Sequence, residues 1–401
     1  MVENRTFKYE VMQCVEGRWQ LVSIGNDKET AIADARKLLA TGGKATQARV
    51  IQQRFMPNGP MTESIVFDEK AAPVAERPIA VKNAPDDVAI CETLEEMYGA
   101  PSRRTIGAVL REYCTKQNLT PTELLHHYPH QRKLQDLGGL LPSAIHRVGS
   151  AQAQKLAKPA KERLNHLDKL IDQIVARSRD FQTERKKLPT FDGEDFGALS
   201  QKIRAALGEG QHDWTVLAML CMYLFEKGTL SGKLEALLEL KGTDEPAVAK
   251  LVDGVIADIL GFNDIIQDLF GAQRNLSTFL IELADLLANR PTAVELCKNP
   301  TLRSIIDRIH AGRAPQCQEA LMERLLRELA SDKPLDKLDP NSDGRLLDRV
   351  VEHLKDDLEN WIGGERAEAA IAYRRAVQRQ QFLRASGLGS IADNMKMPKR
   401  L

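Results

Sequence analysis

Three histidines form the densest group of metal-binding side-chain types in this sequence: His126, His127 and His130. On one continuous helix, His126 and His130 would lie one turn apart and could bind a transition metal together. Pro129 interrupts such a helix, and no nearby carboxylate completes a ligand set. We therefore predict a helix end here, where histidine is favourable beside the last carbonyl groups, and no metal site.

A second candidate site is residues 339–344, Asp-Pro-Asn-Ser-Asp-Gly, which matches the first half of a calcium-binding loop. The twelfth position of such a loop should supply a bidentate glutamate, but in this chain it is Val350. Pro340 suits a turn that leads into a helix, with Asp343 at the N-cap. We therefore expect a turn without a bound ion.

Nucleophilic chemistry has one candidate, Cys114, which lies about a dozen residues before the histidines. No positioned base or oxyanion donor accompanies it, and no phosphate-binding, dinucleotide-binding, nucleophile-elbow or zinc-protease motif occurs. The six cysteines are scattered, without CxxC or zinc spacing, which is typical of reduced thiols in the cytoplasm. The sequence thus predicts no catalytic residue, metal ligand or cofactor.

The region of Cys114 also resembles the first two helices of repressor-type DNA-binding domains. The resemblance covers residues 103–123, where Leu119-Thr120-Pro121 opens a second helix and Glu123 completes a capping box. It then ends, because Pro129 stands where a recognition helix would have to begin. An ordinary pair of antiparallel helices explains the same residues.

The elements that must position these side chains fall into two classes. Residues 7–14, 18–24, 46–55 and 64–67 alternate as strands, and a helix begins after Asn26, which we expect at the N-cap. This order, ββαββ, predicts a small α/β module over residues 1–70. Prolines at 73, 78 and 85 then indicate a linker over residues 71–88.

Every periodic segment after residue 88 has a helical period, so the predicted fold class is mainly α: a multi-helix bundle with a small N-terminal α+β domain (ββαββ). We divide it into a basic helical region (89–188), an acidic helical bundle (189–332), and C-terminal helices with a basic tail (333–401). A long helix over residues 159–187 carries a short heptad-like seam. That seam packs either within its own chain or in a coiled-coil dimer.

Charge is strongly segregated, although the whole chain has 56 basic and 56 acidic residues. Residues 101–188 hold 17 Lys and Arg against 8 Asp and Glu, whereas residues 191–300 hold 9 against 17. The two halves either neutralise each other or offer a basic surface to an acidic partner. The candidate partner-binding residues are Arg103, Arg104, Lys186, Lys187, Arg374 and Arg375.

These observations favour a non-catalytic protein of the cytoplasm that binds a protein partner, as a scaffold or adaptor, and that self-associates as a homo-oligomer. One alternative is a regulatory protein that binds nucleic acid through residues 101–188, which we do not favour. Another is an enzyme with an unrecognised site. The longest apolar run, residues 214–225, is too short to cross a bilayer and predicts a buried helix instead.

Overall fold

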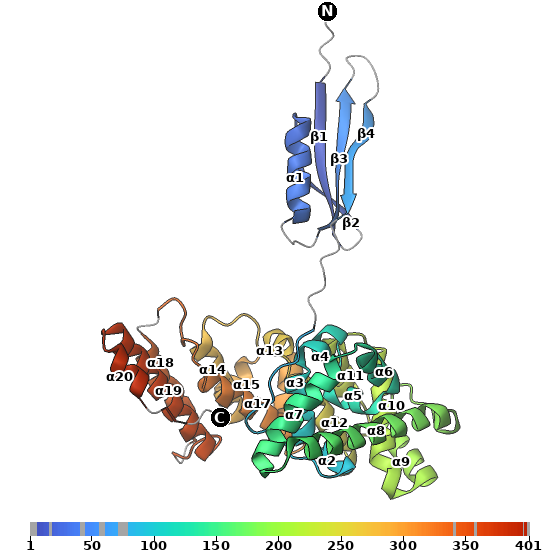
Figure 1. Cartoon of the computed structure of the whole chain (residues 1–401), viewed down its shortest axis with the longest axis vertical. Helices are drawn as coiled ribbons and strands as arrows, with labels where there is room; N and C mark the ends of the chain where they lie inside the picture. Colours follow the sequence, from blue (N-terminus) through green and yellow to red (C-terminus); the bar gives the residue numbers. More distant parts are fainter. Residues whose placement is uncertain are drawn as a thin grey trace, which may run out of the picture. The chain divides into compact units, whose positions relative to one another are not determined.

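The computed structural model describes residues 6–15, 18–40, 45–55, 61–70, 79–339, 342–356, 359–395 and 397–398. The chain divides into two compact units, residues 1–78 and residues 79–401 (Figure 1). We call them the N-terminal unit and the helical unit and describe each by itself. Their content confirms the predicted fold class, a mainly helical protein with a small N-terminal α+β domain.

The N-terminal unit contains β1 (Thr6–Val15), β2 (Arg18–Gly25), α1 (Lys28–Ala40), β3 (Ala45–Phe55) and β4 (Thr62–Lys70). The strands form one antiparallel sheet in the order β2-β1-β3-β4. The predicted ββαββ order is therefore confirmed. One detail differs, because the side chain of Asp27, not Asn26, accepts the 2.8 Å hydrogen bond from the backbone N–H of Thr30 at the start of α1.

One face of this sheet packs against α1. The strands alternate, so every second side chain points to the same face. Those buried against α1 are Tyr9, Val11, Ala48, Val50 and Phe67, and α1 itself contributes Ala31 and Ala35. A single helix thus covers one face of the sheet, mainly over β1 and β3.

The α-helices described in the helical unit range from 5 residues to 25 residues. In chain order they are α2 (Leu94–Tyr98), α3 (Ala100–Val109), α4 (Arg111–Gln117), α5 (Pro121–His126), α6 (Tyr128–Asp136), α7 (Leu140–Leu156), α8 (Ala160–Glu184), the 3-10 helix η1 (Arg185–Lys187), α9 (Phe196–Leu207), α10 (Glu209–Phe225), α11 (Leu230–Glu239), α12 (Pro246–Leu260), α13 (Asn263–Phe270), α14 (Leu276–Leu287), α15 (Pro291–Leu296), α16 (Pro300–His310), α17 (Pro315–Leu329), α18 (Asp343–His353), α19 (Glu365–Ala385) and α20 (Gly389–Asn394).

The capping signals act as the sequence predicts. Thr120 and Glu123 form the capping box of α5, with Pro121 in its first turn. The helix ends at His126, and α6 starts anew at Tyr128, so the break beside Pro129 is confirmed. The apolar run over residues 214–225 lies in α10, and most of its side chains are buried.

The long predicted helix is α8, and its seam packs within its own chain. Leu167 and Ile174 of the seam are buried, together with Leu170, in a cluster with Met97 of α2 and Leu125 of α5. Their apolar surface is thereby removed from water without a second chain. This favours the intrachain alternative for the seam over a coiled-coil dimer.

Part of the predicted linker belongs to the helical unit. Residues 79–88 are irregular, but Ile79, Val81 and Ala84 pack against its core, and the backbone N–H of Lys82 donates to the carbonyl of Val109 at 3.0 Å. The interpretation of 71–88 as one linker therefore needs correction at this end. Residues 71–78 lie outside the described part of the chain.

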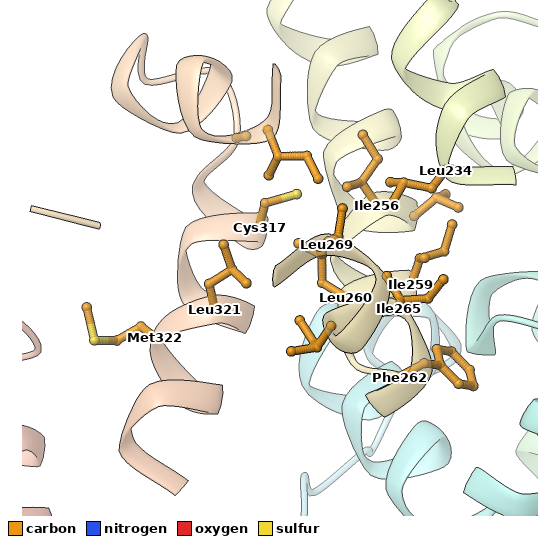
Figure 2. Close-up of a cluster of buried hydrophobic side chains, with 14 of the residues drawn as sticks. Leu234, Ile256, Ile259, Leu260, Phe262, Ile265, Leu269, Cys317, Leu321 and Met322 are labelled. Carbon is orange, nitrogen blue, oxygen red and sulfur yellow. The ribbon is translucent and has the colours of Figure 1, made fainter. Parts of the chain in front are cut away.

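One hydrophobic core runs through the helical unit from Val109 to Ile371. Figure 2 shows the part where Ile256 and Ile259 of α12, Ile265 of α13 and Leu321 of α17 converge. The core crosses the proposed boundaries at 188/189 and 332/333, so these do not separate independent cores. Among the described residues, no helix is long and apolar enough to cross a membrane.

Candidate interaction surface

The β2 edge of the sheet in the N-terminal unit exposes several large apolar side chains. Strand β2 is an edge strand, paired only with β1, and α1 hardly covers it. Leu21 is 51% exposed, Val22 43% and Ile24 54%. Large apolar side chains grouped in this way make β2 a candidate interaction surface.

The composition of β2 leaves this edge without protection. Its sequence, RWQLVSIG, contains one charged side chain, Arg18 at its first position. Soluble proteins usually shield an edge strand with charges, prolines or a covering element, because its free N–H and C=O groups can pair with another strand. Strand β2 has none of these along its centre.

The opposite edge of the sheet, β4, is shielded in the usual way. Its sequence, TESIVFDEK, carries Glu63, Asp68, Glu69 and Lys70. Asp68 also accepts hydrogen bonds from Arg49 Nη2 at 2.7 Å and from Gln47 Nε2 at 2.5 Å, both on β3. The two edges of one sheet therefore differ sharply in how readily they could accept another strand.

The sheet face away from α1 carries both polar and apolar side chains. Gln53 Nε2 of β3 donates to Glu63 Oε1 of β4 at 3.2 Å and to Glu10 Oε1 of β1 at 2.8 Å. Toward β2, the guanidinium of Arg49 stacks on the ring of Trp19, with 4.5 Å between Cζ and the ring centroid. Among the described residues, β2 has three large apolar side chains that are exposed, whereas β4 has one, Ile65.

The basic residues predicted to bind a partner are mostly engaged within the helical unit. Arg103 is 8% exposed, and its guanidinium binds Asp258 at 3.1 Å, the carbonyl of Tyr98 at 2.8 Å and Gln316 at 3.0 Å. Arg374 is 1% exposed and donates to the carbonyl of Ser331 at 2.7 Å. The prediction that these two guanidiniums face a partner does not fit, because burial and internal hydrogen bonds hold them inside the fold.

The other four basic candidates lie at the surface of the helical unit but on different elements. Arg104 pairs with Glu323 at 2.7 Å, and Arg375 lies 3.9 Å from Asp348. Lys186 and Lys187 are exposed on η1. Scattered and partly paired, these side chains do not form one basic site.

The histidines are packing residues. The ring of His126 packs against Tyr98 and Trp214, with centroids 4.9 and 5.4 Å away, and its Nδ1–H donates to the carbonyl of Thr122. Burial lowers the pKa of His126 to about 3 and that of His130 to about 3. Among the described residues, no group of three potential ligands is arranged to hold a metal ion.

The remaining candidates also serve the fold. Cys114 is buried, and burial raises the pKa of its thiol to about 12, so the reactive thiolate does not form at neutral pH. Asp343 does not act as the predicted N-cap: its Oδ1 accepts hydrogen bonds from the backbone N–H groups of Leu335, at 2.9 Å, and Asp336. Residues 340–341 of the calcium-like loop lie outside the described residues.

Comparisons with known protein families, with curated proteins and with solved structures find no match to this chain. Strand β2 is therefore singled out by its own exposure and composition. Sequence reasoning predicted this strand but not its exposed position at an edge of the sheet. The signal was present in the uncharged run Trp19–Gly25, but its place at an edge depends on the order in which the strands pair.

Proposed function

We propose that this protein is a non-catalytic interaction protein that self-associates through the β2 edge of its N-terminal unit. The occupant of the edge is β2 of a second copy. Pairing joins two helical units into one assembly, which is the action of a scaffold. The observation that carries the proposal is the contrast between the edge β2, exposed and with one charged side chain at its first position, and the charged edge β4.

A second copy suits this edge for geometric reasons. Two β2 strands related by a twofold axis run antiparallel, and each donates to and accepts from the other. The exposed side chains Leu21, Val22 and Ile24 of one copy then contact the apolar side chains of the other. Strand addition of this kind gains affinity from main-chain hydrogen bonds and specificity from alternate side chains.

The expected dimer is weak. A single strand pair buries less than the roughly 1,200–2,000 Å² of a standard stable interface. We therefore expect the mass of the full-length protein, measured by light scattering, to rise from monomer toward dimer between about 1 and about 500 μM.

Two isoleucines with the same exposure on opposite edges provide a matched test. Ile24 on β2 and Ile65 on β4 are each 54% exposed. Ile24→Lys places a charge in the proposed interface and should keep the protein monomeric at every concentration. Ile65→Lys should dimerise as the unmodified protein does. A strict monomer throughout this range, or equal loss of dimer in both variants, would contradict the proposal.

A further inference from the structure

A cavity of about 120 Å³ lies inside the helical unit, far in sequence from the strand edge discussed above. Its walls come from the segment before α2 and from α2, α3, α5, α6, α7 and α8. Ile106 of α3, Leu134 of α6, Ala144 of α7 and Ile174 of α8 are among the lining residues. Well-packed protein interiors contain few voids larger than a water molecule, so a void of this size needs an explanation.

Apart from Gln135, the polar side chains in the walls form hydrogen bonds within the protein. Thr105 Oγ1 accepts from the N–H of Ala89 and donates to the carbonyl of Pro101, both at 3.2 Å. Gln152 binds the carbonyl of Ala89 through Nε2 and Arg163 through Oε1.

The side chains of Ser102 and Gln131, which also line the cavity, likewise form hydrogen bonds within the protein. Ser102 Oγ donates to the carbonyl of Glu96 and lies 2.9 Å from the thiol of Cys91. Gln131 donates from Nε2 to Ser178 Oγ at 2.9 Å, although its Oε1 is buried without a partner. The surface that an occupant would touch is therefore formed almost wholly by carbon.

Water is a poor occupant of such a space. A buried water is stable when it makes two to four hydrogen bonds, and these walls offer too few free polar groups. An apolar cavity of roughly 150 Å³ in a protein core stays dry and binds benzene. The cavity described here is of similar size and chemistry.

The outer wall of the cavity borders solvent. Leu141 and Ile145 of α7 and Ile171 of α8 line the cavity and are also partly exposed. The cavity is therefore not sealed from solvent on the side of α7 and α8.

We propose that this cavity binds a small, neutral, apolar molecule about the size of one aromatic ring or a short alkyl chain. Charged groups do not fit, because no ionised side chain lines the cavity to compensate for their desolvation. The site is independent of the β2 edge, and its test can fail without affecting the proposed self-association.

The first experiment uses the full-length protein with its isoleucine δ1-methyl groups labelled for NMR and toluene as the probe. Saturable shifts are expected at Ile106, Ile145, Ile171 and Ile174, which line the cavity. Ile305 and Ile306, in the distant part of the core, should not shift. No shift at the cavity methyls, or equal shifts at both groups, would overturn the proposal.

Two alanines of α7 give matched variants. Ala144 lines the cavity and is 6% exposed, whereas Ala153 is 4% exposed and does not line it. Ala144→Leu should fill the space, keep or raise the melting temperature and reduce toluene affinity at least tenfold. Ala153→Leu should lower the melting temperature because it overpacks a filled region, and should retain toluene binding. Unchanged toluene affinity in Ala144→Leu would place the probe elsewhere and refute the site.

Discussion

The buried ion pair between Lys233 of α11 and Glu123 of α5 allows a quantitative test of how this fold holds its charges. Lys233 Nζ lies 2.6 Å from Glu123 Oε1, and the two side chains are 2% and 0% exposed. Lys233 Nζ also donates to the carbonyl of Asn118 at 2.6 Å. Glu123 Oε2 in turn accepts from the N–H and the hydroxyl of Thr120, which completes the capping box of α5.

The perturbation is Lys233→Met, which keeps most of the side-chain volume and removes the positive charge. Glu123 is then left as a buried carboxylate whose only remaining partners are neutral groups of Thr120. Breaking a buried pair in this way costs about 3–5 kcal/mol, because the remaining charge is desolvated without compensation. Adding Glu123→Gln removes that charge and preserves the capping box, so the double variant should recover a large part of the loss.

The stability lost in the Lys233→Met variant should depend on pH. Burial raises the pKa of Glu123, and removing Lys233 raises this pKa further, because the lysine attracts the carboxylate. A raised carboxyl pKa means that the folded state binds its proton more tightly than the unfolded chain, where the pKa is about 4.3. Protonated Glu123 therefore contributes its full stabilisation in acid. This stabilisation declines as the pH rises above the unfolded-state pKa of about 4.3. The difference between Lys233→Met and the unmodified protein should be smaller at pH 5 than at pH 8.

The assay is urea unfolding followed by the helical circular-dichroism signal, because nearly all helices belong to the helical unit. The control is Lys250→Met, at an exposed lysine of α12, which should change stability by less than about 0.5 kcal/mol. A pH-independent loss, or no recovery in the double variant, would refute the reasoning. It would mean that lost packing of the lysine, not an uncompensated carboxylate, destabilises the protein.

Two further predictions concern the buried histidines and thiols. His126, with a folded-state pKa of about 3, stabilises the fold fully above the unfolded pKa of about 6.5 and progressively less as the pH falls toward 3. His126→Phe, which keeps a ring packed against Tyr98 and Trp214, should therefore reduce the loss of stability between pH 6.5 and 4, measured by thermal unfolding. An unchanged acid sensitivity would exclude His126 as a cause. Iodoacetamide at pH 8 should leave Cys114 unmodified in the folded protein and alkylate it in urea, and rapid labelling of the folded state, read by mass spectrometry, would contradict its burial.

Local patterns in the sequence predicted the elements well because short-range physics decides them. Alternation found all four strands of the N-terminal unit, and Thr120 with Glu123 marked the start of α5. The first turn of α1 shows the limit of such reasoning. Asn26 and Asp27 are adjacent and both suit an N-cap, and only the backbone geometry assigns the role to Asp27.

The candidate sites could not be predicted with the same success, because burial depends on contacts between residues far apart in the chain. Arg103 and Arg104 are neighbours of the same type, yet one is 8% exposed and contacts Asp258, while the other lies at the surface beside Glu323. A helix turns about 100° per residue, so adjacent side chains face different surroundings. The unprotected edge at β2 was missed for a related reason, since composition indicates a strand but not its position in the sheet.

The segregated charge of this chain illustrates how internal pairing can account for a feature that sequence alone assigns to a partner. Arg103 of the basic region pairs with Asp258 of the acidic region at 3.1 Å, and Arg104 pairs with Glu323. Asp258 also accepts hydrogen bonds from the N–H and hydroxyl of Thr122, at 3.0 and 2.6 Å, so α12 binds α3 and α5 through one carboxylate. Opposite charges on distant segments therefore align helices within one core. The β2 edge of the N-terminal unit presents backbone and apolar surface. The contact proposed there would depend little on salt, unlike one made by a basic patch.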